Sequence, residues 1–84
     1  MSPDVVSVRP EPPCSLRVSF ADGTSGRVTF RESHLTGVFE PLRNPDFFEQ
    51  VRITDGFVTW PGEIDLAPDA MYAAIVADGE WRLG

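Results

Sequence analysis

The sequence predicts an α+β domain: a small antiparallel sheet of about five strands built on two Asp-Gly hairpins, with a short helical turn near 45–49 and a C-terminal helix near 68–77. Two observations predict the sheet, because apolar residues recur at every second position and Asp-Gly separates two pairs of such segments. A third observation predicts the helix, since the apolar spacing after residue 62 becomes that of a helix. The length of 84 residues corresponds to one domain, residues 1–84.

The N-terminal part of the chain reads as three strands. Residues 4–8 predict an edge strand that ends in the proline-rich segment 9–13, because proline removes donors from a strand ladder. Strands at about 14–20 and 25–30 follow, joined by a turn at Asp22-Gly23 in which glycine supplies a positive φ. The residues expected on the core face of this hairpin are Leu16, Val18, Phe20, Val28 and Phe30.

A second hairpin is expected further along the chain. Residues 50–54 and 57–60 are two short alternating segments on either side of Asp55-Gly56. In this register Val51 and Ile53 face the same side as Val58 and Trp60. Between the hairpins, Asn44 is expected to cap a short helical turn that starts at Pro45. Three apolar side chains beside this turn are expected to close one end of the core: Phe39, Leu42 and Phe47.

The C-terminal segment has the composition of a helix. Pro68 suits a first helical position and Asp78-Gly79 a helix end, while Met71, Ala74 and Ile75 form one apolar stripe. An alternative remains open, in which the helix spans only one or two turns and residues 74–76 are extended. The last five residues, 80–84, are expected to fray.

Composition and charge limit the classes of function. The single cysteine, Cys14, cannot form an intrachain disulfide, and the sequence shows neither a membrane-length apolar run nor a basic-then-apolar leader, so a cytoplasmic protein with no membrane partner is expected. The net charge is −6: residues 1–31 carry a balance of +1, and residues 32–84 a balance of −7. An acidic chain is a poor direct ligand for nucleic acid.

Few residues are candidates for chemistry. Cys14 lacks an evident base, and His34 is expected in a solvated loop, although it could serve as a base. Glu63, Asp65 and Asp69 could together hold a hard cation or transfer protons, but Asp65 and Asp69 are also suited to the start of a helix, which we favour. The sequence therefore predicts no catalytic residue, no cofactor and no metal site.

An ordered set of motifs resembles a bacterial family known as domain of unknown function 2442. The resemblance runs from about Val5 to Tyr72, and the segment after Tyr72 lies outside it. The chain departs from the pattern at residues 60–65. The motifs that carry the resemblance are Phe20-Ala21-Asp22-Gly23, Gly37-Val38-Phe39-Glu40-Pro41-Leu42, Asn44-Pro45-Asp46-Phe47, Trp60-Pro61, Asp65-Leu66 and Tyr72.

The resemblance implies a compact α+β domain, found alone or fused to a helix-turn-helix domain, and often encoded beside another small protein as in toxin–antitoxin pairs. It implies no catalytic residue. The leading hypothesis is therefore a non-enzymatic module that binds a small protein or associates with itself, with an antitoxin-like role. The alternative is a small metal-dependent or hydrolytic enzyme that uses Glu63, Asp65 and Asp69 near His34. A third hypothesis is a homodimer that pairs edge strands.

Overall fold

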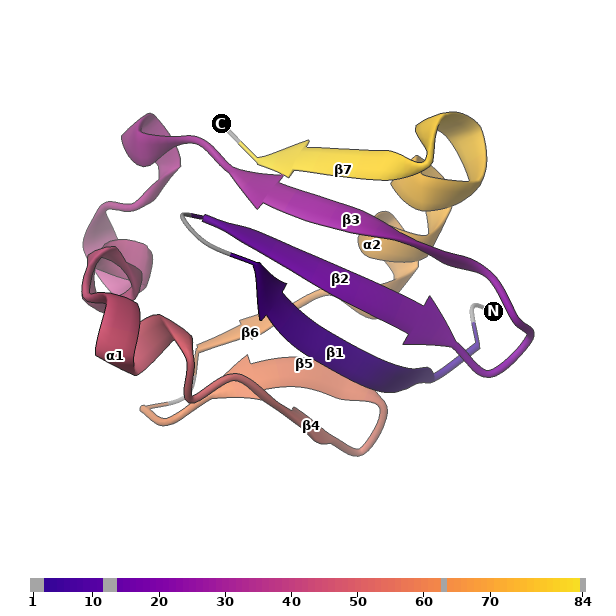
Figure 1. Cartoon of the computed structure of the whole chain (residues 1–84), viewed down its shortest axis with the longest axis horizontal. Coiled ribbons are helices and arrows are strands. Elements are labelled where there is room, and N and C mark those ends of the chain that lie inside the picture. Colours follow the sequence, from indigo (N-terminus) through magenta and orange to yellow (C-terminus); the bar gives the residue numbers. More distant parts are fainter. Residues whose placement is uncertain (1–2, 12–13, 63, 84) are drawn as a thin grey trace.

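The computed structural model describes residues 3–11, 14–62 and 64–83, which form two packed β-sheets with helices at their ends (Figure 1). The predicted α+β class is confirmed, although seven strands in two sheets replace the expected single sheet of about five. In chain order the elements are β1 (Val5–Glu11), β2 (Ser15–Phe20), β3 (Ser25–Phe30), the 3₁₀ helices η1 (Glu32–His34) and η2 (Gly37–Arg43), α1 (Pro45–Phe48), β4 (Arg52–Thr54), β5 (Phe57–Trp60), β6 (Ile64–Leu66), α2 (Pro68–Asp78) and β7 (Glu80–Leu83).

The first sheet has the strand order β1-β2-β3-β7. Its first three strands are antiparallel, and β7 pairs parallel to β3. Residues of alternating polarity put one face of this sheet in the core and the other in solvent. The predicted core face is confirmed, since all five of its residues are buried: Leu16, Val18, Phe20, Val28 and Phe30.

Strand β1 is longer and less regular than the sequence predicts. It continues beyond the expected residues 4–8 through Arg9 and Pro10 and ends at Glu11, within the proline-rich segment where its end was expected. Pro10 is tolerated because β1 lies at the edge of its sheet, where a missing donor costs no ladder bond. The register shifts between Val5 and Ser7, as in a bulge that inserts one extra residue.

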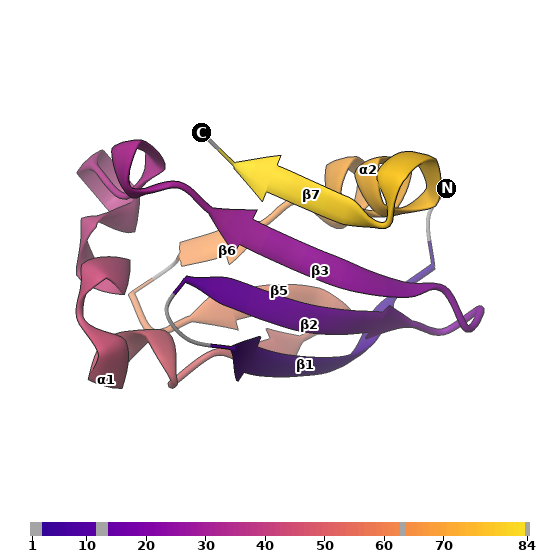
Figure 2. The ribbon, with the colours of Figure 1, turned by 45° about the horizontal axis from the view of Figure 1, so that its top comes forward.

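The C-terminal helix is confirmed as α2, and the alternative of an extended segment at 74–76 is wrong. The expectation that residues 80–84 fray is also wrong for 80–83, which form β7 beside β3. Gly79 allows the chain to reverse between α2 and β7. It is the C-cap of α2, and its φ of 76° lets the chain turn directly into the strand. Figure 2 shows β7 along the edge of the first sheet and α2 close to its start.

The second sheet has the order β4-β5-β6 and is antiparallel throughout. Its Asp-Gly turn is confirmed, with positive φ at both Asp55 and Gly56. Strand β6 was not expected, since the last strand of the expected sheet ends at residue 60. Three residues of alternation are too short a signal to identify a strand, but Ile64 and Leu66 are buried on either side of the exposed Asp65.

The two sheets enclose one core between them. Figure 2 shows the second sheet on one side of the first, with η1, η2 and α1 gathered at one end of the molecule. Within the described residues, no helix is long and apolar enough to cross a membrane. The buried core consists of Val5, Leu16, Val18, Phe20, Val28, Phe30, Leu35, Leu42, Phe48, Val58, Trp60, Ile64, Leu66, Met71 and Ile75.

Candidate binding groove

An apolar groove of about 580 Å³ lies at the end of the molecule where the short helices meet the second sheet. Its volume falls in the range of sites that take small molecules or side chains. Helix η2 contributes one wall, α1 the second, and the turn between β5 and β6 the third. The lining residues are Gly37, Val38, Pro41, Phe47, Pro61, Gly62 and Ile64.

Arg43 holds the η2 wall in place. Its Nε donates to the carbonyl oxygen of Leu35 at 2.6 Å, and its Nη2 donates to that of Glu32 at 3.0 Å. Nη1 also pairs with the carboxylate of Glu32 at 3.3 Å. Because one planar guanidinium satisfies several acceptors at once, the loop between η1 and η2 is fixed without regular secondary structure.

A cap and a buried indole position the α1 wall. The predicted cap is confirmed, since Oδ1 of Asn44 accepts the backbone N–H of Asp46 at 2.9 Å and Pro45 occupies the first helical position. At the other end of α1, Nε1 of Trp60 donates to the carbonyl oxygen of Phe48 at 2.9 Å. This bond joins α1 to β5, so the side chain of Phe47 is held over the groove.

Three aromatic rings pack together in the core, next to the elements that form the groove. Phe30 meets Phe48 and Trp60 at centroid distances of 6.0 and 6.1 Å, both in edge-to-face geometry. Phe39 and Phe47, expected to close this end of the core, are partly buried against it, whereas Leu42 is fully buried. Phe48 and Trp60 are the chain neighbours of the lining residues Phe47 and Pro61, so two walls of the groove are anchored in the core, while the lining residue Val38 is 72% exposed.

Charged residues line two hollows next to the groove. One adjoining hollow includes Glu40 and Arg43, and another, on the outer face of the second sheet, includes Arg52 and Asp65. Carboxylates outnumber arginines in this part of the molecule, so its net charge is negative. Over residues 32–62 and 64–66 the charged residues are Glu32, Glu40, Asp46, Glu49, Asp55 and Asp65 against Arg43 and Arg52.

Cys14, the candidate nucleophile, and His34, the candidate base, are both half-buried. The ring of His34 lies 5.0 Å from that of Phe39 and 6.3 Å from that of Phe30, so it is half-buried among aromatic rings and not in a solvated loop. Cys14 is a half-buried free thiol at the start of β2, and its backbone carbonyl accepts the N–H of Phe30 at 2.8 Å. Among the described residues, no hydrogen bond joins the Cys14 thiol to His34.

The acidic candidates are dispersed over two elements. Asp65 lies in β6, where it pairs across the sheet with Thr59, and Asp69 lies in the first turn of α2. The expectation that Asp65 caps α2 is wrong, because the N-cap is Ala67 and makes no side-chain cap bond. Glu63 lies outside the described residues. In the part of the chain that the structure describes, no three His, Cys, Asp or Glu residues gather as metal ligands.

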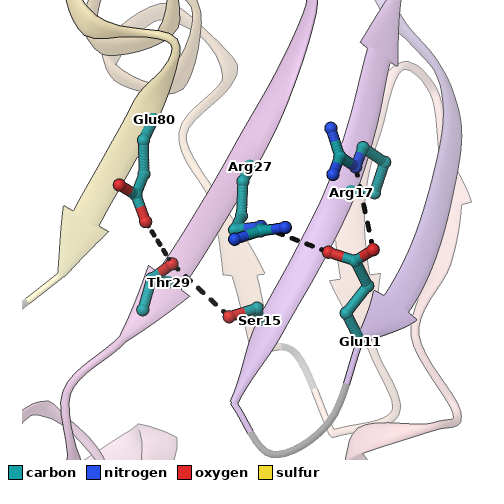
Figure 3. A network of polar contacts seen from close by, with 6 residues as sticks. All are labelled: Glu11, Ser15, Arg17, Arg27, Thr29 and Glu80. Carbon is teal, nitrogen blue, oxygen red and sulfur yellow. Dashed lines mark hydrogen bonds and ion pairs between the residues drawn. The ribbon is translucent and has the colours of Figure 1, made fainter.

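The exposed face of the first sheet carries a polar network (Figure 3). Glu11 lies between Arg17 and Arg27, at 3.8 and 3.2 Å from their Nε atoms. On the neighbouring row, Thr29 donates to Oε2 of Glu80 at 2.6 Å. This hydrogen bond, supported by the charges of Arg82 and Arg27, lowers the pKa of Glu80 below its ordinary value of 4.5, against the opposing effect of desolvation.

Comparison with known families identifies the family of the chain. A model of the family described as "Protein of unknown function (DUF2442)" matches residues 5–77. The chain belongs to this family. The match confirms the resemblance and extends it past Tyr72 to residue 77, into α2. No curated protein and no solved structure matches the chain.

The groove was not anticipated from the sequence, although its walls carry the motifs on which the resemblance to DUF2442 depends. Gly37, Val38 and Pro41 come from the motif over residues 37–42, Phe47 from the motif over residues 44–47, and Pro61 from Trp60-Pro61. Their convergence on one surface hollow, from separate segments between Gly37 and Ile64, is the signal that could have indicated a site.

Proposed function

We propose that the protein is a non-enzymatic protein-binding module, antitoxin-like in role, whose apolar groove receives a side chain of a small basic partner. The observation that carries this proposal is the convergence of three DUF2442 motifs on one groove with an apolar lining. Apolar hollows of this kind bury the anchoring side chains of protein partners.

The lining of the groove favours the binding of a partner's side chain over catalysis on a substrate. Among the described residues its lining consists of glycine, proline and apolar side chains, none of which ionises or acts as a nucleophile. The candidates for chemistry lie elsewhere: His34 is packed against Phe30 and Phe39, and Asp65 lies on the outer face of the second sheet. A hollow that offers only apolar contacts can bind, but it has no group with which to transfer a proton.

Charge favours a basic partner. The part of the chain that forms the groove carries six carboxylates and two arginines among its described residues, and one of those arginines, Arg43, is already paired with Glu32. Opposite charge around an apolar anchor raises the association rate and selects against acidic competitors. Such a domain would mask a basic protein, which is the arrangement expected of an acidic antitoxin.

The test is retention of a partner by the tagged full chain from its source cells. Val38→Arg places a bulky cation at the rim of the groove, and at 72% exposure the change should leave folding intact. Val76→Arg makes the same change on α2, where the side chain is 60% exposed and distant in the fold from the groove. We expect the wild-type chain and Val76→Arg to retain the same small basic protein and Val38→Arg to lose it.

Salt provides a second measurement. Because part of the attraction is between exposed charges, binding should weaken as ionic strength rises. A chain recovered with no bound protein would contradict the proposal. Equal retention by Val38→Arg and Val76→Arg would also contradict it, because the partner would then bind a different surface.

A further inference from the structure

Strand β7 presents an open edge. Among the described residues it pairs with β3 alone, and it ends the order β1-β2-β3-β7. The carbonyl oxygens of Gly79 and Leu83 accept hydrogen bonds from β3 at 3.2 and 2.7 Å. Because successive residues of a strand turn their backbone groups to opposite sides, the N–H and C=O groups of Glu80 and Arg82 point away from β3.

The opposite edge of the same sheet is less available. The N–H of Val5 in β1 donates to the carbonyl oxygen of Gly56 at 3.1 Å, so β1 is joined to the second sheet there. The register shift after Val5 and the missing donor of Pro10 interrupt the rest of that edge. The edge that is available for pairing is therefore β7 and not β1.

The charges of β7 are complementary to those of a second, antiparallel copy of the same strand. Glu80 and Arg82 lie two residues apart on the solvent side of the sheet, paired with Arg27 and Thr29 respectively. Figure 3 shows Glu80 on this face beside Thr29. Charged side chains often protect a strand edge against association, but the two on β7 are of opposite sign. Here a two-fold axis through Trp81 would place Glu80 of each copy opposite Arg82 of the other.

We propose that two copies of this chain associate through antiparallel pairing of their β7 strands about a two-fold axis at Trp81. Glu80 of one copy and Arg82 of its partner form the hydrogen-bonded pairs, since their backbone groups already face outward. The two Trp81 residues form the central non-hydrogen-bonded pair, in which side chains approach most closely. The product is one continuous sheet through both copies.

The apolar side of β7 supports this arrangement. Trp81 and Leu83 point toward the core side of the sheet, beside Val28 and Phe30, yet both remain only partly buried. Pairing would remove part of this remaining apolar surface from water and bring the two Trp81 rings into contact. The strand has four residues, so the interface is smaller than that of a stable dimer and the association should depend on protein concentration.

Charge reversal separates this interface from any other. Glu80→Arg and Arg82→Glu each place like charges opposite one another in a homodimer, so each variant alone should dimerise on the order of tenfold more weakly than the wild type. An equimolar mixture of the two variants restores opposite charges at both positions of a heterodimer. Sedimentation of the wild type, each variant and the mixture should therefore show dimer, monomer, monomer and dimer.

The mixture also controls for folding. Glu80→Arg removes the hydrogen bond from Thr29, but the restored heterodimer contains that same variant, so loss of folding could not explain recovery. Arg52→Glu is the matched control, because it makes the same charge change on β4, an edge strand of the second sheet, and should leave dimerisation unchanged. A mixture that stays monomeric, or a dimer abolished by Arg52→Glu, would overturn the proposal.

Amide exchange gives a direct readout of the edge. The amide protons of Glu80 and Arg82 should exchange more slowly as protein concentration rises, whereas those of Trp81 and Leu83, which face β3, should not change. A wild-type chain that remains monomeric at the highest concentration used for NMR would refute the pairing. These measurements do not involve the groove, so this inference and the proposed partner can fail separately.

Discussion

The hydroxyl of Tyr72 donates a 2.6 Å hydrogen bond to Oδ2 of Asp22 and so joins α2 to the turn between β2 and β3. The turn residue also accepts the backbone N–H of Thr24 at 2.9 Å. The Tyr72 ring meets Phe20 edge-on, with 5.1 Å between the ring centroids. The Asp-Gly turn is thus held by its own backbone and by a helix fifty residues further along the chain.

This hydrogen bond predicts a dependence of stability on pH. The Tyr72 hydroxyl, followed by the Thr24 N–H, lowers the pKa of Asp22 below its ordinary 3.8, and Asp22 raises the pKa of Tyr72 above 10.0. The contribution of Asp22 is present above pH 3.8 and lost as pH falls through its folded-state pKa. The contribution of Tyr72 is present below pH 10.0 and lost as pH rises through its own.

Tyr72→Phe should therefore lower Tm modestly at neutral pH, and the difference from the wild type should shrink at both extremes of pH. Both groups are exposed to solvent, which keeps the effect small. Asp22→Asn is the control, because the amide oxygen still accepts the hydrogen bond but the acidic limb of the pH dependence disappears. A difference in Tm that is constant from acid to neutral pH would refute the assigned role of Asp22.

A second carboxylate should respond to a neighbour on the outer face of the first sheet. Thr29→Val removes the hydroxyl that donates to Glu80, so the pKa of Glu80 should rise toward 4.5. The stability that Glu80 contributes above pH 4.5, and loses as pH falls through its folded-state pKa, should decrease accordingly. Carboxyl NMR titration measures the shift directly. Ser15→Ala is the comparison, because its 3.4 Å contact reaches Thr29 and not Glu80, and an equal shift there would contradict the assignment.

Gly26 should not tolerate even a methyl group. A Cβ built there lies 2.7 Å from the carbonyl oxygen of Gly79 and 2.7 Å from Cγ2 of Ile75, because α2 and the start of β7 pack directly on β3. Gly26→Ala should reduce the free energy of unfolding by about 1–3 kcal/mol through overpacking. Denaturant titration measures the loss. Ser25→Ala, at the exposed neighbouring position, should remain within about 0.5 kcal/mol of the wild type, and equal effects would contradict this explanation.

The two hairpins could be predicted because their signals are local. Asp22-Gly23 and Asp55-Gly56 specify their turns through glycine's access to positive φ, and the alternation beside them assigns the core face. The helix over Pro68–Asp78 was likewise predictable from its proline start and glycine end. These features need no information from distant parts of the chain.

Strands β6 and β7 could not be predicted because partners distant in the sequence stabilise them. Strand β6 has three residues and β7 has four, too few for a periodic pattern, and β7 becomes a strand only because α2 returns it to the edge of β3. The groove has the same origin, since its walls come from η2, α1 and the β5–β6 turn. Each wall could be recognised in the sequence as a motif. That the three walls come together depends on the packing of the two sheets.

Trp60 should be the most informative of the side chains that anchor the walls of the groove. It is 1% exposed, and its Nε1 donates to the carbonyl oxygen of Phe48 at 2.9 Å. Trp60→Phe removes this donor, leaves the carbonyl without it, and loses ring volume next to Phe30, so the free energy of unfolding should fall by about 1–3 kcal/mol. The amide protons of α1 should also exchange faster, because the bond that joins α1 to β5 is gone. Phe57→Leu, at a 41% exposed position on the same strand, should change the free energy by no more than about 0.5 kcal/mol, and an α1 that keeps its protection in Trp60→Phe would show that the indole does not hold the wall.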